Sequence, residues 1–277
     1  MRGRKSTIIL LILFFIGLSV LLYPGISSYW NSKTQSEAII DYESMLASYK
    51  SEDYTAIFED ADKYNAALAA LAVPLREYTS IEDWYWDTLD VGGTGMIGYV
   101  TLPKISQELP LYHGTSDSVL SSAVGHFQGS SLPVGGATTH SVVSAHRGLP
   151  TAVLFTHLDR MEVGDTFFFT ILDRTITYEV DQVRIVEPDD VSLIQIEEGE
   201  DYCTLLTCTP YGINTHRLLV RGHQVDTSQE SRIYIANEAY RVKPLVVMPL
   251  VALPIVFVLL VYVMVVPVKK EQLDEDI

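Results

Sequence analysis

The 277-residue chain contains only two cysteines, Cys203 and Cys208. Two cysteines are too few for a disulfide framework, and they lack the paired spacing of a zinc site. Basic residues are also scarce, since 19 Lys and Arg stand against 35 Asp and Glu and leave a formal net charge of −16. Nucleic-acid binding depends largely on the neutralisation of phosphates by cations, so we predict no nucleic-acid partner. We also predict no structural metal.

Two apolar runs flank the rest of the chain. The first, Thr7 to Tyr23, follows Arg2, Arg4 and Lys5 and as a helix would be roughly 25 Å long, close to the thickness of a bilayer core. It is a signal peptide or an anchor, and an uncleaved anchor is favoured because no convincing cleavage site follows it.

The second apolar run, Leu245 to Val268, ends at Lys269 and Lys270. A buried hydrophobic hairpin is the alternative interpretation, but no charge interrupts the run and membrane helices tolerate proline. By the positive-inside rule both basic flanks are cytoplasmic, so the segment between the runs is predicted to lie outside the cell, attached to the cell membrane.

The pattern of apolar and polar residues divides the chain into further parts. Apolar residues recur at three- and four-residue steps between Ser36 and Leu71 and predict two amphipathic helices, with a break at residues 51–53. Residues 76–95, REYTSIEDWYWDTLDVGGTG, have no steady period and predict a long loop. The predicted parts are a signal-anchor (1–30), a helical extension with the loop (31–95), a β domain (96–226), a linker (227–244), a C-terminal span (245–268) and a cytoplasmic tail (269–277).

From Met96 onward, short β-branched and aromatic runs alternate with turn-forming residues. Such a series predicts a mainly β domain, a closed barrel or a sandwich, with the helices packed outside. The expected strands are residues 96–102, 139–146, 166–172, 175–180, 183–186, 202–208 and 217–225.

Cys208 ends one predicted strand, and the turn Thr209-Pro210-Tyr211-Gly212 follows it directly. Cys203 lies an odd number of residues earlier on the same strand, so the two side chains should point to opposite faces, roughly 16 Å apart along the strand. One thiol is therefore expected in the core and the other, Cys208, is a candidate nucleophile. The alternative is that Cys208 is a small buried hydrophobe, as most free cysteines are.

Two further residues complete a candidate site. If residues 202–208 and 217–225 pair as antiparallel strands, Arg217 returns to the level of Cys208, where a guanidinium favours the thiolate or steadies an oxyanion. A cysteine nucleophile also needs a proton carrier. Of seven histidines, His146 is the best placed, because it ends a β-like run just before Arg147-Gly148-Leu149-Pro150.

Three separated motifs then resemble one family. TLLTC at Thr204–Cys208 is similar to the TLxTC signature of sortases, Arg217 follows at the family's spacing, and SAHRGLP resembles the family's histidine loop. The phrases GHFQGSSLPVGGATTHSVVSAHRGLP and LLTCTPYGINTHRLLVRG are especially similar to the class C, pilus-assembling members. Two flanking spans and a helical extension fit that class, and the likeness is strong over residues 96–225.

The resemblance implies a sortase-type eight-stranded β-barrel with N-terminal helices and flanking transmembrane helices. It also implies a cysteine transpeptidase without a metal or organic cofactor. Cys208 would attack the Thr–Gly bond of an LPxTG-like sorting signal, His146 would protonate the departing amine, and Arg217 would hold the substrate backbone or the oxyanion. The acceptor in class C is a lysine of a neighbouring pilin. The implied partners are pilins or surface proteins with such signals.

Class C members also carry a lid over the site, with an Asp-Pro-aromatic motif. The matching region here, EDWYWD, has no Asp-Pro step. Asp83 could still pair with Arg217 while Trp84 or Tyr85 covers Cys208, or the aromatic side chains could simply pack the loop onto the barrel. Both interpretations stay open.

Two alternatives to pilus polymerisation remain. One is a housekeeping sortase that attaches proteins to peptidoglycan. The other is a noncatalytic, membrane-tethered binding or assembly protein that keeps the barrel only as a surface.

Overall fold

The computed structural model describes residues 2–227 and Val256. Its N-terminal part is helical: α1 (Arg2–Leu46), α2 (Ser51–Ala69), α3 (Pro74–Glu77), the 3-10 turn η1 (Tyr78–Ile81) and α4 (Glu82–Asp87). The prediction of a long loop over residues 76–95 was therefore wrong for its first half. This half consists of three short helical turns. η1 and α4 pack aromatic and apolar side chains against the main core, and α3 packs Leu75 against a second cluster on the barrel.

Helix α1 combines two predicted elements, the apolar run and the first amphipathic helix, in 45 continuous residues. Many apolar side chains between Ile9 and Trp30 are exposed, among them Phe15 and Leu21, whereas Ile39, Tyr42 and Leu46 near its C-terminal end are buried. By length and composition the segment Ile12–Leu46 could cross a membrane. The predicted linker, second span and tail fall on residues outside the described part, apart from Thr227 and Val256.

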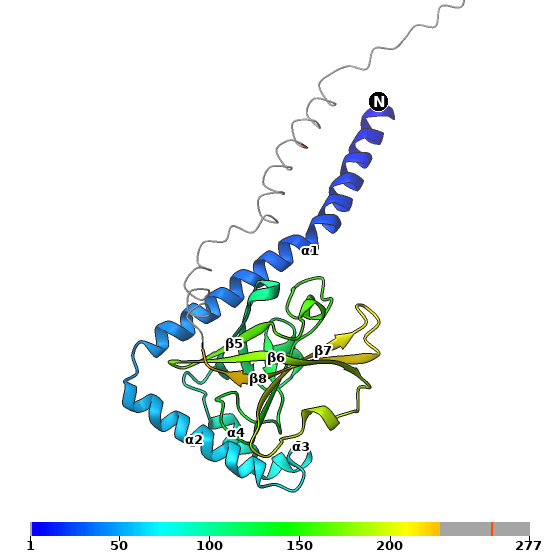
Figure 1. Cartoon of the computed structure of the whole chain (residues 1–277). Coiled ribbons are helices and arrows are strands. Elements are labelled where there is room, and N and C mark those ends of the chain that lie inside the picture. The colour runs from blue at the N-terminus through cyan, green and yellow to red at the C-terminus, as the bar shows by residue number, and fades with distance from the viewer. Residues whose placement is uncertain (1, 228–255, 257–277) are drawn as a thin grey trace, which may run out of the picture. The chain divides into compact units, whose positions relative to one another are not determined.

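Eight strands form a closed barrel in the order β1-β2-β3-β4-β7-β8-β6-β5, with β5 pairing back to β1. Figure 1 shows the barrel strands crossing below α1, with α2 alongside. Two neighbouring pairs are parallel, β2 with β3 and β4 with β7, and the other pairs are antiparallel. The strands are β1 (Met96–Leu102), β2 (Gln107–His113), β3 (Val124–His126), β4 (Thr139–Ser144), β5 (Thr166–Ile171), β6 (Arg174–Val186), β7 (Asp201–Thr209) and β8 (His216–Val225). Short helical turns connect them: η2 (Pro103–Ile105), α5 (Asp117–Leu120), η3 (Leu158–Arg160) and η4 (Ser192–Ile194).

Each predicted strand is present, and the prediction of a closed eight-stranded barrel is confirmed. The runs at 175–180 and 183–186 are one strand, β6, whose register shifts between Val180 and Gln182. Strands β2 and β3 were missed. Pro110 lies inside β2, and a proline weakens the sequence pattern that predicts a strand. Strand β3 is only three residues long.

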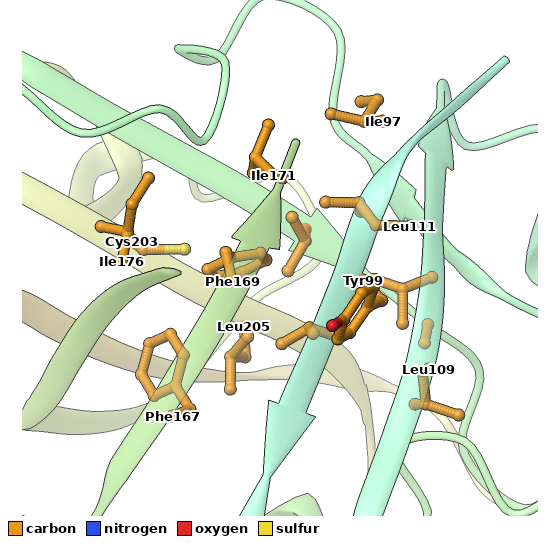
Figure 2. Packing of buried hydrophobic residues seen from close by; sticks show 14 of the residues in the cluster. Ile97, Tyr99, Leu109, Leu111, Phe167, Phe169, Ile171, Ile176, Cys203 and Leu205 are labelled. Atoms are coloured by element: carbon orange, nitrogen blue, oxygen red, sulfur yellow. The ribbon is translucent and has the colours of Figure 1, made fainter. Parts of the chain in front are cut away.

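The barrel interior is filled by aromatic and aliphatic side chains. Figure 2 shows Phe167, Phe169 and Leu205 among them, with Cys203 in the same layer. Closure between β1 and β5 needs Gly98, because a β-carbon there would lie 2.3 Å from the carbonyl oxygen of Thr170. The prediction that Cys203 belongs to the core is confirmed, since its side chain is fully buried.

The helices are tied to the barrel by buried hydrogen bonds. The hydroxyl of Tyr42 in α1 donates to the carbonyl of Ile97 at 2.8 Å and accepts from the amide of Leu172 at 3.0 Å. In α2 the amide side chain of Asn65 both donates to the carbonyl of Leu132 and accepts from its amide. Because these partners are buried, the contacts fix where α1 and α2 lie on the barrel.

Three histidines are buried and hydrogen-bonded, His113, His126 and His140, and the last two have no exposed surface. His126 Nε2 lies 2.8 Å from the carbonyl of Ser131, and burial lowers the pKa of His126 to about 3. His140 Nε2 lies 2.8 Å from the hydroxyl of Thr204 on β7, and burial lowers the pKa of His140 to about 4.

The burial of His126 and His140 predicts that the fold is less stable in acid. A histidine in the unfolded chain titrates near pH 6.5, so below that pH the unfolded chain binds more protons than the folded one. The free energy of unfolding therefore decreases as the pH is lowered. We expect each to remove about 2 kcal/mol by about pH 5. Urea unfolding of the full chain in detergent at about pH 7.5 and about pH 5 measures this loss. H126Q and H140Q should each reduce the difference. An equal acid loss in the wild type and in both variants would contradict this assignment.

Candidate active site

Strand β7 lies between β4 and β8, and both pairings converge on Cys208. In the antiparallel pair β7–β8, Cys208 is directly opposite Arg217, and Thr209 is opposite His216. The predicted return of Arg217 to the level of Cys208 is therefore present in the register. Adjacent strands are about 4.8 Å apart, so the two backbones are close at this point.

His146 lies on the other side of β7. The parallel pair β4–β7 ends with Ser144 opposite Leu206. Beyond it the amide of Ala145 donates to the carbonyl of Leu206 at 3.3 Å, and the hydroxyl of Thr207 donates to the carbonyl of Ala145 at 2.7 Å. Continued for two residues past the last pair, this alignment would bring His146 level with Cys208 and Arg217, and we call these three residues the row.

The row faces outward from the barrel. Since side chains alternate along a strand, Cys208 shares a face with Leu206, and Arg217 shares one with Leu219. Leu206 and Leu219 belong to a second apolar cluster outside the main core, which we call the outer cluster. Its members are Val142, Ile194 and Leu219, with Leu75, Phe127, Val186, Leu193 and Leu206 packed against them. This cluster is an apolar layer next to the row, in which Val142, Ile194 and Leu219 are buried and Leu206 is only partly buried.

The two thiols have different environments, as alternation predicted. Cys203 is fully buried, and burial raises its pKa well above the usual value, whereas Cys208 is only half-buried. A nucleophilic thiolate requires access and a polar setting. Only Cys208 meets the first requirement.

The guanidinium of Arg217 is held by the turn between β7 and β8. Its Nη1 donates to the carbonyls of His216 at 3.2 Å and Asn214 at 3.4 Å. His216 points elsewhere, with its ring nitrogen 3.3 Å from a carboxylate oxygen of Glu187. Arg217 therefore lies beside Cys208 with free donor capacity in a guanidinium that carries five N–H groups.

The aromatic side chains of α4 pack against α2 and the barrel. Trp84 donates to the carboxylate of Asp60 at 3.1 Å, and the hydroxyl of Tyr85 accepts from the amide of Gly114 at 2.8 Å and lies 3.1 Å from His126 Nδ1. Tyr85 is fully buried. Between residues 2 and 227, no ion pair joins Asp83 to Arg217 and no recorded contact joins Trp84 or Tyr85 to Cys208. These contacts agree with the interpretation that the aromatic side chains pack this segment onto the barrel. A lid over Cys208 stays a prediction.

The residue that does reach the outer cluster from the N-terminal extension is Leu75 of α3, which sequence inspection missed. The α3–η1 segment lies close against Gly129, where a β-carbon would meet the side chain of Tyr78 and the backbone of Leu75. The sequence signal was weak because Pro74-Leu75 is a single apolar step between the second helix and the aromatic stretch. Within the described part of the chain, no group of three His, Cys, Asp or Glu side chains is arranged to hold a metal ion.

A cysteine, a histidine and an arginine on the outside of a closed eight-stranded barrel indicate a cysteine acyltransferase. Comparison with known proteins identifies the family. A family model described as a sortase domain matches residues 100–225. The chain belongs to the sortase family, whose members are cysteine transpeptidases.

Solved structures of sortase C resemble the chain over most of their length. Sortase C1 of Streptococcus agalactiae is 47% identical, with a TM-score of 0.68, and the match covers 69% of this chain and 100% of that one. Sortase C of Streptococcus pneumoniae is 41% identical, with a TM-score of 0.61, and the match covers 69% and 97%. Sortase C of Clostridium perfringens is 38% identical, with a TM-score of 0.59, covering 69% and 100%. The structural neighbours are thus class C sortases.

Curated sequence relatives are more distant. Sortase D of Bacillus subtilis is 30% identical over 131 residues, which is 46% of this chain and 63% of that protein. The chain therefore spans about three fifths of the length of that relative.

The different settings of the two thiols predict selective alkylation. Iodoacetamide should modify Cys208 in the folded chain and modify Cys203 about a hundredfold more slowly, because access to Cys203 requires the barrel to open. Intact mass with peptide mapping measures both sites. C208A should abolish the fast adduct, C203A should retain it, and both thiols should react in denaturant. Fast modification of Cys203 in the native protein would contradict the placement of the two side chains.

Proposed function

We propose that the chain is a membrane-anchored cysteine transpeptidase of the class C type, which cleaves an LPxTG-like sorting signal and joins the acyl group to a lysine amine of another pilin subunit. The observation that carries the proposal is the row of His146, Cys208 and Arg217 set by the registers of β4, β7 and β8. A thiol, an imidazole and a guanidinium side by side supply a nucleophile, a proton carrier and an anion-binding group.

The first half-reaction is acyl transfer to Cys208. The Cys208 thiolate attacks the threonine carbonyl of the signal, the C–N bond to the next residue breaks, and His146 donates a proton to the departing amine. Arg217 either binds the substrate backbone or stabilises the oxyanion, and both roles use N–H donors at the level of Cys208.

The second half-reaction regenerates the thiol. The lysine amine attacks the thioester carbonyl, gives a proton to His146, and the C–S bond breaks to release Cys208. The product is an isopeptide bond. No step needs an oxidant, a reductant or a nucleotide, because the thioester keeps the acyl group activated between the two steps.

The outer cluster supports an apolar sorting signal as substrate. It begins two residues from Cys208, at Leu206, which like Leu193 is only partly buried over the buried Leu219 and Val142. The leucine and proline that precede the threonine of an LPxTG-type signal would find an apolar surface there, where burial stabilises them by roughly 25 cal/mol per Å². The Clostridium perfringens sortase C is described with the C-terminal cell wall sorting motif, which suggests a signal of the same kind for this chain.

Class C similarity favours polymerisation over cell-wall attachment. The Streptococcus pneumoniae sortase C is described in terms of pilin substrate specificity. The sequence relatives include sortases named A and D, for which the finer assignment does not follow. The apolar N-terminal half of α1 suits an anchor that keeps the barrel at the membrane surface, with the barrel outside the cell.

The first prediction is a thioacyl intermediate. The full chain in detergent, mixed with an LPxTG-type peptide, should gain the mass of the acyl fragment on Cys208, and hydroxylamine should remove it. C208A should form none, and H146A and R217A should lower the rate of adduct formation by about a hundredfold or more, as losses of acid–base and oxyanion groups do. A noncatalytic binding or assembly protein would form no adduct, and its C208A variant would keep its function.

A second prediction concerns the acceptor. Given a lysine-bearing pilin fragment and a cell-wall-derived amine together, the acylated enzyme should transfer mainly to the lysine, giving an isopeptide that tandem mass spectrometry locates. Transfer mainly to the cell-wall amine would identify a housekeeping sortase and contradict the polymerase assignment, while leaving the thioacyl chemistry in place.

A further inference from the structure

The side chain of Arg147 joins the two strand ends that carry His146 and Cys208. Its Nη1 donates to the hydroxyl of Thr209, the residue after Cys208, at 3.0 Å. Its Nη2 donates to the carboxylate of Asp159 at 2.6 Å. The side chain of Arg147 is only 7% exposed. These two bonds fix the guanidinium through its Nη1 and Nη2, whereas its buried Nε has no hydrogen-bond partner in the described part of the chain.

This contact lies where the backbone ladder between β4 and β7 has ended. The last paired residues are Ser144 and Leu206, and the last backbone bond runs from Ala145 to Leu206. Past that point the spacing of His146 and Cys208 depends on side-chain ties and on the loop that follows β4. The bond from Arg147 to Thr209 lies one residue beyond both candidate catalytic groups.

The loop after β4 is fixed in turn. The amide of Phe155 donates to the carbonyl of His146 at 3.2 Å, and the amide of Gly148 donates to the hydroxyl of Thr156 at 3.2 Å. Asp159, in η3, completes this loop by pairing with Arg147. The backbone of His146 is therefore held from the loop side, and Arg147 connects that loop to β7.

We propose that Arg147 is a positioning residue, which sets the distance between the imidazole of His146 and the thiol of Cys208 through its bonds to Thr209 and Asp159. The charge of Arg147 is matched by Asp159, so its contribution lies in geometry rather than in stabilising the thiolate. The inference rests on the proposed transpeptidase function, since it specifies how two of that site's groups are aligned. Small displacements of aligned groups cost large factors in rate, about a hundredfold for 1 Å.

The leaving group separates positioning of His146 from a general structural effect. With an amide substrate, the C–N bond breaks only as the amine receives a proton, which His146 donates. With a thioester of the same acyl group, the C–S bond breaks and a thiolate leaves with the electron pair, so no proton is needed. Displacement of His146 should therefore slow acylation by the amide far more than acylation by the thioester.

The experiment compares both substrates on the full chain in detergent. R147M and T209V should lower the rate constant of acylation by the amide peptide about tenfold or more, with KM little changed, and should lower the thioester rate by about twofold at most. H146A should show the same selective pattern. T209S, which keeps the hydroxyl, should restore the amide rate. R147K should not, because an ammonium cannot span both partners as a planar guanidinium does.

The matched control is R160M, which removes an exposed arginine from the same short helix as Asp159 and should leave both rates unchanged. Thermal unfolding of each variant reports whether the fold persists. Equal losses with both substrates, or unchanged amide rates in folded R147M and T209V, would overturn the positioning role. If the wild-type chain forms no thioester with either substrate, the proposed function itself fails, which is a different outcome.

Discussion

The pairing of β7 with two different neighbours is the constraint on which the site depends. β4 runs parallel to β7 and β8 runs antiparallel to it, and each register alone determines one neighbour of Cys208. A slip of either strand by one residue would turn its side chains to the other face. His146 or Arg217 would then point into the barrel, where a charged group has no partner. The packed interior, with Cys203 and Leu205 on the opposite face of β7, opposes such a slip.

Side chains reinforce the pairing of β4 and β7 at both ends. At the beginning of the strands His140 bonds the hydroxyl of Thr204, and beyond their ends Arg147 bonds the hydroxyl of Thr209. Both contacts use a threonine hydroxyl on the strand that carries the nucleophile. Thr209 accepts from Arg147, whereas Thr204 donates to Nε2 of neutral His140, whose Nδ1 donates to the carbonyl of Gln195. The N-terminal helices contact the same body from outside, with Asn65 of α2 bonded to the backbone of Leu132. These contacts hold the strands that carry the row in place, which suits a site that requires alignment.

Local patterns predicted much of the fold and of the site. β1 and β7 follow from their β-branched and aromatic content, and the opposite settings of Cys203 and Cys208 follow from alternation alone. β2 was missed because Pro110 is tolerated where the partner strand does not require its N–H, a circumstance that only pairing reveals. The stretch from Arg76 to Asp87 lacks helical periodicity because its turns are too short to repeat, yet packing against α2 stabilises them. The division of β6 into two runs reflects its register shift.

The sequence by itself determined the membrane-length apolar helix, the β character of the domain, the single accessible thiol and the motifs that resemble sortases, since each depends on composition or on neighbours along the chain. Only the tertiary structure decided that His146 lies level with Cys208, that Leu75 joins the outer cluster, that Trp84 and Tyr85 face α2 and the barrel, and that Arg147 spans two strand ends. These contacts join residues far apart in sequence. Local preference carries no information about them, because they arise from strand order and register in the closed barrel.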